Sequence, residues 1–316
     1  MCKVGVLIGG DSAEAEVSRS SGREIAKSLS GAFQSVNLFE LSEYKGWDSL
    51  VAAFRATDVD VVFPALHGGP GEDGTLQQVL DDAGIPYVGS GSQASAMGLD
   101  KEEAKKAFRQ NGLPVAKDAV VSEDELSPAK VKSVLEMLGG SVVVKPIAQG
   151  SAIGISFCKS AAELEESLRA AFKYGPKALI EERIIGKEIT AGLLERNGLE
   201  VFPLIEIRTP PGTWCDFEHR YQPGLSEHVI PAPLSVETGR RVSEIARGAF
   251  RALGCRDLAR AEFVVPEKGE PVILEVNTMP GFTPTSLYPD GAKAAGISFG
   301  ELCAHLIRRA HSRANS

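Results

Sequence analysis

Cysteine is scarce in this sequence of 316 residues, and the cysteines present are scattered. They are odd in number, far apart and without a CxxC pair: Cys2, Cys158, Cys215, Cys255 and Cys303. A disulfide framework or a structural zinc site needs cysteines in pairs or clusters. The pattern therefore predicts isolated, reduced thiols.

Long apolar runs and a surplus of positive charge are also missing. The apolar run Val4–Ile8 stops at Gly9-Gly10, which is too short for a signal-peptide core or a membrane span. Lysine and arginine number 34 against 42 acidic residues, a formal net charge of -8, so no basic surplus is available for a nucleic-acid backbone. These absences predict a cytoplasmic protein that binds neither membranes nor nucleic acid.

The length predicts several domains, because 316 residues exceed the usual size of one hydrophobic core. We place them at residues 1–98, 99–190 and 191–316. In the first, strands alternate with helices, which is typical of an α/β domain with a parallel sheet. Its predicted strands are 4–8, 36–41, 60–66 and 86–88, and its predicted helices are 18–29 and 75–82.

The other two domains mix strands and helices in an α+β pattern. The second opens with a helix for which Asp100 is the N-cap, and Glu103 completes a capping box. A long loop at Thr209–Pro233 in the third is of a length that is usually functional or mobile. The remaining predicted elements are strands at 141–147, 178–185, 188–194, 201–208, 259–266 and 271–277, and helices after Ser160, at 235–253 and after Ser298.

Two acidic side chains face each other in a predicted hairpin near the C-terminus. Centring its turn on Lys268-Gly269 places Glu262 opposite Glu275 and Arg260 opposite Asn277. Opposed carboxylates destabilise a strand pair unless positive charge lies between them. Two carboxylates and an amide oxygen suit Mg²⁺ completed by phosphate oxygens. Alternatively, the face is solvated and Arg260 neutralises a carboxylate.

Two lysines stand beside glycine-rich segments. Lys145 ends a β-branched strand and precedes the loop Gln149–Gly154, whose backbone amides can close over phosphates. Lys101 lies in the first turn of a helix, where anions are favoured. The spacing matches neither GxxxxGK[ST] nor GxGxxG, so each lysine can equally be an ordinary surface residue.

Three further polar residues lie at strand ends. Glu181 and Glu188 can accept hydrogen bonds from an adenine amine and from ribose hydroxyls, although charged strand ends are usually only solvated. His67 opens the segment HGGPGEDG, where the density of glycine favours close approach of a ligand. It can equally be a loop histidine with satisfied hydrogen bonds.

In order along the chain, these motifs resemble the D-alanine–D-alanine ligase family. The matching segments are Gly9–Ser18 (GGDSAEAEVS), His67–Gln77 (HGGPGEDGTLQ), Lys145-Pro146, Gly150-Ser151, Leu258–Glu262, Leu274–Gly281 (LEVNTMPG) and Thr283–Leu287. Several motifs in order are far more specific than one. The resemblance implies an ATP-grasp fold, in which ATP lies between two α+β lobes beside an N-terminal α/β domain.

The resemblance also implies a role for each matching residue. ATP would be bound by Lys101, Lys145, Glu181, Ile184, Glu188 and Arg220. Magnesium would be bound by Glu262, Glu275 and Asn277, with two ions expected and Mn²⁺ able to replace them.

Substrate and catalytic roles follow in the same way. Glu16 would hold the ammonium of the first D-alanine, and His67 would belong to the same substrate site. Ser286 and the Leu287 amide would bind the second carboxylate. The oxyanion would be stabilised by Arg260 and the Gly281 amide, and a triad of Glu16, Ser151 and Tyr221 would latch the long loop over the site.

The sequence departs from the family pattern in four places. Glu262 replaces the usual Asp, Arg220 replaces the usual Lys, and Met279 replaces a common Ser. The loop Ile147–Ala152 lacks the customary Arg-Glu and second Ser. These departures leave room for altered substrates, whereas Tyr221 favours a dipeptide product.

Three functions therefore compete. The leading one is a ligase that makes D-alanyl-D-alanine from ATP and two D-alanines through an acyl phosphate, for peptidoglycan precursors. The second is an ATP-grasp ligase for another amino acid or hydroxy acid pair. The third is a nucleotide-binding protein without catalysis. A homodimer is expected from the family alone.

Overall fold

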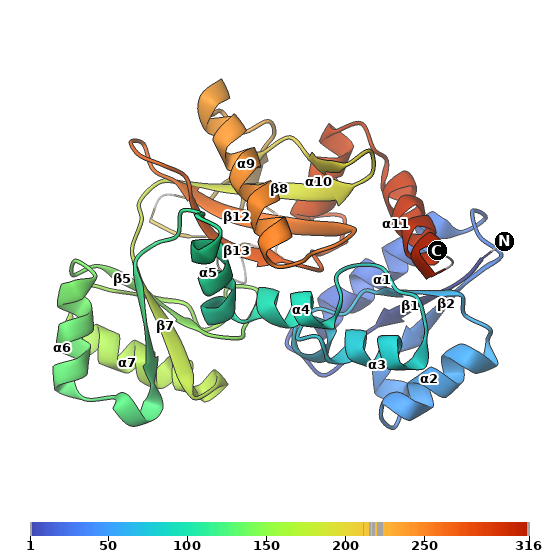
Figure 1. Ribbon diagram of the computed structural model, residues 1–316, viewed down its shortest axis with the longest axis horizontal. Helices are drawn as coiled ribbons and strands as arrows, with labels where there is room; N and C mark the ends of the chain where they lie inside the picture. The colour runs from blue at the N-terminus through green and yellow to red at the C-terminus, as the bar shows by residue number, and fades with distance from the viewer. Residues whose placement is uncertain (1, 211, 215, 217–218, 220–223, 315–316) are drawn as a thin grey trace.

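The computed structural model describes residues 2–210, 212–214, 216, 219 and 224–314, in three regions that each have their own sheet (Figure 1). The N-terminal domain lies at the lower right of Figure 1, the central lobe at the left and the C-terminal lobe above them. This confirms the predicted arrangement of an α/β domain followed by two α+β lobes.

The N-terminal domain has a parallel sheet in the order β2–β1–β3. Side chains of a strand alternate between its faces. Val4 and Val6 of β1 therefore pack with α1 and α11, whereas Leu7 packs with α2 and α3. The elements are β1 (Lys3–Ile8), α1 (Ala15–Leu29), β2 (Ser35–Glu40), α2 (Trp47–Ala56), β3 (Val61–Pro64), α3 (Thr75–Ala83) and α4 (Ser92–Leu99).

The central lobe is an antiparallel sheet in the order β4–β7–β5–β6, covered by α6 and α7 at the left end of Figure 1. Its elements are β4 (Asp118–Ser122), α6 (Pro128–Met137), β5 (Val142–Pro146), β6 (Ser156–Cys158), α7 (Ala161–Ala171) and β7 (Lys177–Glu182). The hydroxyl of Ser160 accepts from the Glu163 amide at 3.3 Å and caps α7, as the sequence predicts.

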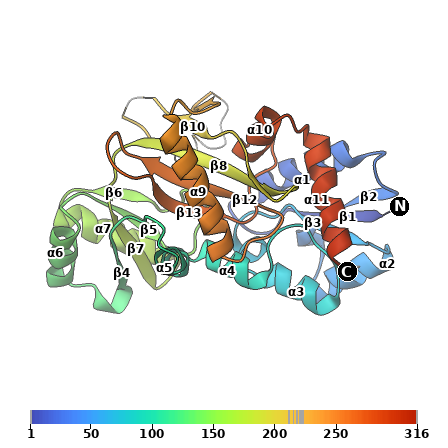
Figure 2. The same cartoon turned by 45° about the horizontal axis from the view of Figure 1, so that its top comes forward.

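The C-terminal lobe contains a sheet in the order β11–β10–β8–β12–β13, and Figure 2 shows α9 lying over it. The predicted strand 201–208 is two strands, because Pro203 has no N–H for a ladder and interrupts it. The elements are β8 (Lys187–Glu195), β9 (Leu199–Val201), β10 (Ile205–Arg208), β11 (Glu227–Val229), α9 (Val236–Ala252), β12 (Leu258–Val265), β13 (Val272–Asn277), α10 (Leu287–Ala294) and α11 (Phe299–Ala314).

Two helices pack outside the region that their sequence position suggests. Helix α5 (Lys101–Gln110) buries Ala104 and Phe108 against the C-terminal lobe, and α11 packs on α1 and β3 of the N-terminal domain. The predicted boundary at 190/191 falls inside β8, which pairs with β12 from Lys187 to Leu194. The sheets divide the chain before Lys187 instead.

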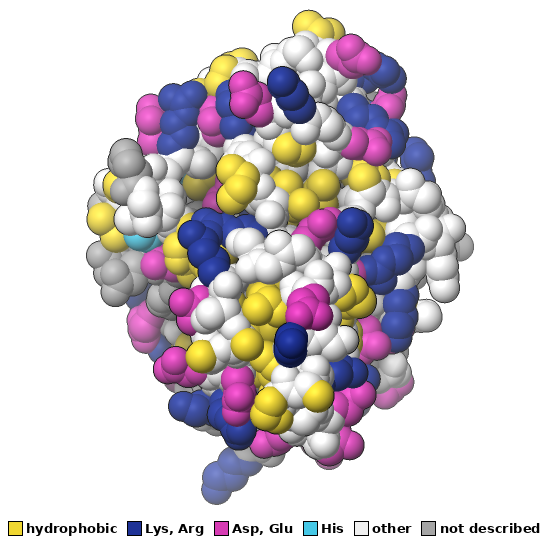
Figure 3. All heavy atoms as spheres, turned by 90° about the vertical axis from the view of Figure 1, so that its left-hand side faces the viewer, with side chains coloured by type: hydrophobic (Ala, Val, Ile, Leu, Met, Phe, Trp, Pro, Cys, Tyr) yellow, Lys and Arg dark blue, Asp and Glu magenta, His cyan; other side chains and the backbone are white. Residues whose placement is uncertain are grey.

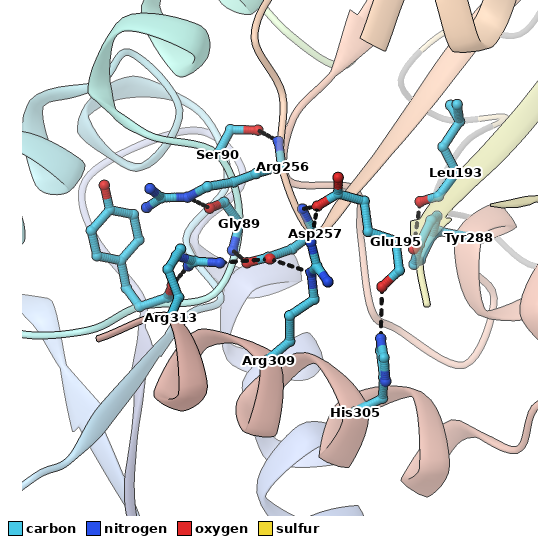
Figure 4. A network of polar contacts seen from close by, with 11 residues as sticks. Gly89, Ser90, Leu193, Glu195, Arg256, Asp257, Tyr288, His305, Arg309 and Arg313 are labelled. Atoms are coloured by element: carbon cyan, nitrogen blue, oxygen red, sulfur yellow. Dashed lines mark hydrogen bonds and ion pairs between the residues drawn. The ribbon is translucent and has the colours of Figure 1, made fainter. Parts of the chain in front are cut away.

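A buried carboxylate ties the N-terminal domain to the C-terminal lobe (Figure 4). Asp257 is 0% exposed, and its side chain accepts from the Gly89 amide at 2.9 Å, Arg309 at 3.0 Å and Arg313 at 2.7 Å. Its own amide donates to Glu195 at 2.9 Å. Because Gly89, Asp257 and α11 come from distant parts of the chain, this network holds the two regions in one orientation.

The surface of the central lobe carries charges of both signs. Figure 3 shows lysine and arginine side chains interspersed with acidic ones on this face. In the described part of the chain, no helix combines the length and apolarity needed to cross a membrane. Cys2, Cys158, Cys255 and Cys303 are free thiols, whereas Cys215 lies outside the described residues.

Candidate active site

The carboxylate hairpin forms with the predicted register. Glu262 on β12 lies opposite Glu275 on β13, and Arg260 lies opposite Asn277. The register shifts between Glu262 and Phe263, so β13 carries one extra residue between its paired positions, Leu274. Bulges of this kind are frequent beside active sites, where they re-aim side chains. Here the bulge lets both Leu274 and Glu275 line one cavity.

Positive charge lies beside both opposed carboxylates. Arg260 forms an ion pair with Glu262, and its guanidinium also lies 3.2 Å from Thr190 Oγ1. Lys101 Nζ lies 3.9 Å from Glu275 Oε2. Arg260 therefore does neutralise a carboxylate, as the alternative interpretation of the hairpin predicted. The face is not solvated, however, because Arg260 is 7% and Glu262 is 8% exposed.

A buried cluster of charges joins Glu181 of the central lobe to two lysines, one of which, Lys105, also lies 3.5 Å from Asp118 Oδ1. Glu181 is 2% exposed and forms ion pairs with Lys145, at 2.6 Å, and with Lys105. Burial by itself raises the pKa of Glu181, but attraction by Lys145 and Lys105 outweighs it and lowers the pKa to about 2. Burial likewise opposes the charge of Lys145, and attraction by Glu181 raises its pKa. Glu181 and Lys145 are therefore both charged at neutral pH.

Lys101 is fixed at the start of α5 between the two lobes. The side chain of Asp100 caps the helix by accepting from the Glu103 amide at 2.9 Å. Lys101 Nζ donates to the Gln149 carbonyl at 2.5 Å, and burial lowers the pKa of this lysine. Its charge is thus held against the glycine-rich loop rather than in solvent, unlike that of an ordinary surface lysine.

The glycine-rich loop has a strained backbone that presents Ser151. Ser151 has φ 49° and Ala152 has φ 60°, in a region that costs energy for residues other than glycine and that clusters at functional sites. The Ser151 hydroxyl donates to the carboxylate of Glu14. The loop is thereby joined to the N-terminal domain.

The assignment of Glu16 is wrong, and Glu14 occupies the position expected for it. The side chain of Glu16 is 81% exposed and pairs with Arg19 on the surface, whereas Glu14 is 5% exposed and lines the cavity with Ser151. Helix α1 begins at Ala15. Glu14 precedes the helix and turns inward, while Glu16 in the first turn points to solvent.

His67 is buried, with a polar neighbour near each ring nitrogen. It is 4% exposed, with Nε2 3.1 Å from Ser21 Oγ and Nδ1 3.6 Å from Glu72 Oε1. It also lines the cavity, so the residue has a hydrogen bond to Ser21 and a position in the site at once.

The N-terminus of α10 forms another wall of the cavity that Glu14, Ser151 and His67 line. Ser286 is its N-cap residue, and its hydroxyl accepts from the Thr283 amide at 3.0 Å. A Cβ at Gly281 would lie 2.7 Å from Ser286 Oγ, so glycine is needed for this close approach. Gly281, Ser286 and Leu287 all line the same cavity, which places the start of α10 where an anion is favoured.

Two neighbouring cavities meet at Lys101, Gln149 and Glu275, which line both. The first, which we call the substrate cavity, is also lined by Glu14, His67, Ser151, Arg260, Asn277 and Ser286. The second, the nucleotide cavity, is also lined by Lys145, Glu181, Ile184, Glu188, Glu262 and Trp214. Arg220 and Tyr221 lie outside the described residues.

Comparison with known proteins identifies the family that has this architecture. Residues 43–90 match the family described as "D-ala D-ala ligase N-terminus", and residues 107–308 match "D-ala D-ala ligase C-terminus". The chain belongs to the D-alanine–D-alanine ligase family. The predicted family and its ATP-grasp fold are thereby confirmed.

Relatives match over nearly the whole chain. The D-alanine–D-alanine ligase of Desulforamulus reducens is 40% identical over 314 residues, covering 98% of both chains. That of Desulforudis audaxviator is 42% identical over 312 residues, covering 98% of this chain and 99% of its own. The crystal structure of D-alanine–D-alanine ligase from Bacillus anthracis complexed with ATP has a TM-score of 0.84 and 30% identity, covering 99% of this chain and 98% of its own.

Several residues of the two cavities and of the charge cluster around Glu181 were not predicted from the sequence. Lys105 lies one helical turn after Lys101, so helical spacing could have found it. Trp214 packs on Phe157 with ring centroids 5.1 Å apart, and both line the nucleotide cavity. No sequence pattern connects Phe157 in the central lobe with the long loop that carries Trp214. His228 in the substrate cavity was likewise overlooked.

Proposed function

We propose that this chain is an ATP-dependent ligase that forms D-alanyl-D-alanine from two D-alanines through a D-alanyl phosphate, for peptidoglycan precursors. The observation that carries the proposal is the junction of the two cavities at Lys101 and Glu275. A phosphoryl group must pass from nucleotide to carboxylate, so the donor and acceptor sites have to meet at one point. Cations held at that point stabilise the transferring group.

The nucleotide cavity has groups for each part of ATP. Ile184 and the rings of Trp214 and Phe157 offer an apolar surface for adenine. Glu181 and Glu188 offer hydrogen-bond acceptors for the adenine amine and for the ribose hydroxyls. Lys145 and Lys101 offer positive charge toward the phosphates. Because both lysines are buried, their charges act in a medium that screens them little.

The opposed carboxylates fit a magnesium site. Glu262 and Glu275 face each other on paired strands, and Asn277 Oδ1 accepts from the Met279 amide at 3.0 Å, which fixes the orientation of its amide group. Oxygen ligands of this kind suit Mg²⁺. Bound Mg²⁺, in one or two ions, or Mn²⁺ in its place, would supply charge that neutralises the phosphate oxygens.

The substrate cavity offers groups for two amino acids. The carboxylate of Glu14 can hold the ammonium of the first, and the start of α10 at Ser286 and Leu287 can hold the carboxylate of the second. Arg260 and the Gly281 amide can stabilise the oxyanion that forms when the amine attacks the acyl phosphate. Closure over both cavities would protect that acyl phosphate from water.

The test is phosphate release from ATP and Mg²⁺ with and without D-alanine, with chromatography of the product. D-Alanine-dependent turnover to the dipeptide is expected. Turnover with other amino or hydroxy acids only would favour the second function, which the departures at Glu262 and Arg220 motivate. Nucleotide binding without turnover would favour the third.

The variant Glu275→Ala tests the metal assignment. We expect a loss of activity of about 10²-fold or more, because one of the two opposed carboxylates is removed. Glu270→Ala is the matched control, since Glu270 lies in the same hairpin and pairs with Arg241 on the surface. Near-normal turnover by a folded Glu275→Ala variant would refute the assignment.

We also propose that the enzyme works in the cytoplasm, where ATP is supplied, and that it is a homodimer. Light scattering at assay concentrations tests the second statement, since a monomeric mass would contradict it.

A further inference from the structure

A histidine–carboxylate pair lines the substrate cavity, and none of the roles above uses it. His228 lies on β11, and Asp290 lies in the first turn of α10. The Nδ1 atom of His228 lies 2.8 Å from Oδ2 of Asp290. His228 lines the same cavity as Ser286, Leu287 and Arg260. The pair therefore adjoins the groups to which the second amino acid is assigned.

Strand register places His228 on the reactive face of the sheet. His228 lies opposite Ile207, and Ile207 lies opposite Glu188 on β8. Thr190 lies two residues after Glu188 on β8 and is paired with Glu262 on β12. Glu262 is in turn paired with Glu275 on β13. Side chains two apart on a strand share a face. The imidazole is thus on the side of the sheet that carries the opposed carboxylates.

Asp290 determines which nitrogen of His228 can accept a proton. An ionised carboxylate only accepts hydrogen bonds, so Nδ1 carries the hydrogen and the lone pair is on Nε2. Among the described residues, no hydrogen-bond partner is found for this Nε2. A carboxylate that orients an imidazole in this way is the arrangement of a general base.

The other histidine of the cavity is not equipped for this role. Ser21 Oγ accepts from the Phe282 amide at 3.2 Å, so its hydroxyl hydrogen is directed to His67 Nε2 at 3.1 Å. His67 Nδ1 then carries the hydrogen that faces Glu72. The lone pair of His67 Nε2 is thus used by Ser21, whereas no described residue uses that of His228 Nε2.

We propose that His228 is the general base that deprotonates the ammonium of the second amino acid, with Asp290 as its positioning residue. The inference rests on the proposed ligase function. An ammonium has no lone pair, so one proton must pass to Nε2 of His228 before the nitrogen attacks the acyl phosphate. The new C–N bond forms, the C–O bond to phosphate breaks, and the second proton of the nitrogen leaves with the phosphate. His228 then releases its proton to water.

Hydroxylamine separates proton removal from the rest of the reaction. It is unprotonated at neutral pH and attacks an acyl phosphate without a base, giving a hydroxamate. The experiment measures two products of the full-length enzyme with ATP, Mg²⁺ and D-alanine: the dipeptide, and D-alanyl hydroxamate when hydroxylamine is added. A residue that only supports the fold would affect both products equally.

The variant His228→Gln is expected to lose about 10²-fold or more of dipeptide formation while hydroxamate formation stays within about threefold of wild type. Asp290→Asn is expected to show the same selective loss, because its amide can donate to Nδ1 and leave Nε2 protonated. It carries the test if His228→Gln does not fold. Equal loss of both products, or unchanged dipeptide formation, would overturn the proposal.

Two controls complete the design. His305→Gln replaces a histidine of α11 that contacts the Glu195 carbonyl at 2.8 Å, a bond that glutamine can also make, and it should leave both rates unchanged. If wild type forms neither product, the proposed function fails. If wild type forms both and the variants do not separate them, only the role of His228 fails.

Discussion

The variant Lys105→Met tests whether the buried charge cluster under the nucleotide cavity depends on both of its lysines. Lys105 is 1% exposed, pairs with Glu181 and donates to the Ala116 carbonyl at 3.2 Å. It also lies 3.5 Å from Asp118, which keeps Arg109 as a second cation. Methionine fills a similar volume without the charge. The change leaves Glu181 buried with Lys145 as its remaining cation.

The shifted pKa of Glu181 gives the size of the expected effect. The lysines lower the pKa from 4.5 to about 2, which corresponds to about 3 kcal/mol of preference for the ionised carboxylate. Removing one partner of a buried ion pair costs about 3–5 kcal/mol. Because burial already lowers the pKa of Lys105 and Lys145 remains, we expect the lower end, a loss of about 3 kcal/mol in the free energy of unfolding.

The sign of the pH dependence follows from the lowered pKa. A carboxyl whose pKa is lower in the folded state stabilises the protein above its unfolded pKa, and that stability is lost as the pH falls toward the folded value. For Glu181 the window runs from 4.5 down to about 2. The variant raises the folded pKa of Glu181 toward its unfolded value. Wild type and variant should therefore differ most at neutral pH and converge within this window.

The assay is urea-induced unfolding followed by circular dichroism at pH 7 and within the acid window. Lys106→Met is the matched control, because Lys106 lies next in α5 and pairs only on the surface with Glu102 and Glu103. Its unfolding midpoint should stay close to that of wild type. If Lys105→Met and Lys106→Met unfold at the same urea concentration, the reasoning about the buried cluster is refuted.

Three further changes test other parts of the structure. Glu14→Gln should lower kcat/KM for D-alanine by about 10²-fold, while Glu16→Gln should leave it near wild type. A large loss in Glu16→Gln and none in Glu14→Gln, measured in the ligase assay, would show that Glu16 binds the ammonium after all. Asp257→Asn should lower the free energy of unfolding by about 3 kcal/mol, measured by urea unfolding, since two arginines lose their buried carboxylate; an unchanged midpoint would contradict this. Trp214→Ala should raise the KM for ATP more than it lowers kcat, because Trp214 and Phe157 pack on each other and both line the nucleotide cavity; an unchanged KM would show that this contact is not used in binding.

Local patterns were sufficient for much of the fold. Strand and helix alternation identified the N-terminal α/β domain, and the caps at Asp100 and Ser160 identified two helix starts. Helices α2, α4, α6 and α10 were not predicted, and the predicted strand 86–88 forms only the single bridge between Val62 and Tyr87. Helix α2 has apolar residues at helical spacing, Trp47, Leu50, Val51 and Phe54, so its own pattern could have identified it.

The carboxylate hairpin depends on both kinds of information. Its turn and the spacing of Glu262 and Glu275 predicted the correct partners. The bulge at Leu274 did not follow from the sequence, and near the turn the strands pair in a register shifted by one residue. The opposed carboxylates meet as predicted because the bulge absorbs that shift.

The sequence by itself determined the family, the order of the elements and most of the residue types in the site, because signatures and periodicities are local properties of the chain. Only the tertiary structure decided which residue of a signature faces the cavity, as with Glu14 over Glu16, where one residue precedes a helix and the other lies in its exposed first turn. It also decided that Lys105 meets Glu181 and that His228 meets Asp290. These pairs are separated by 76 and 62 positions, and contacts over such distances are set by how the sheets and helices pack.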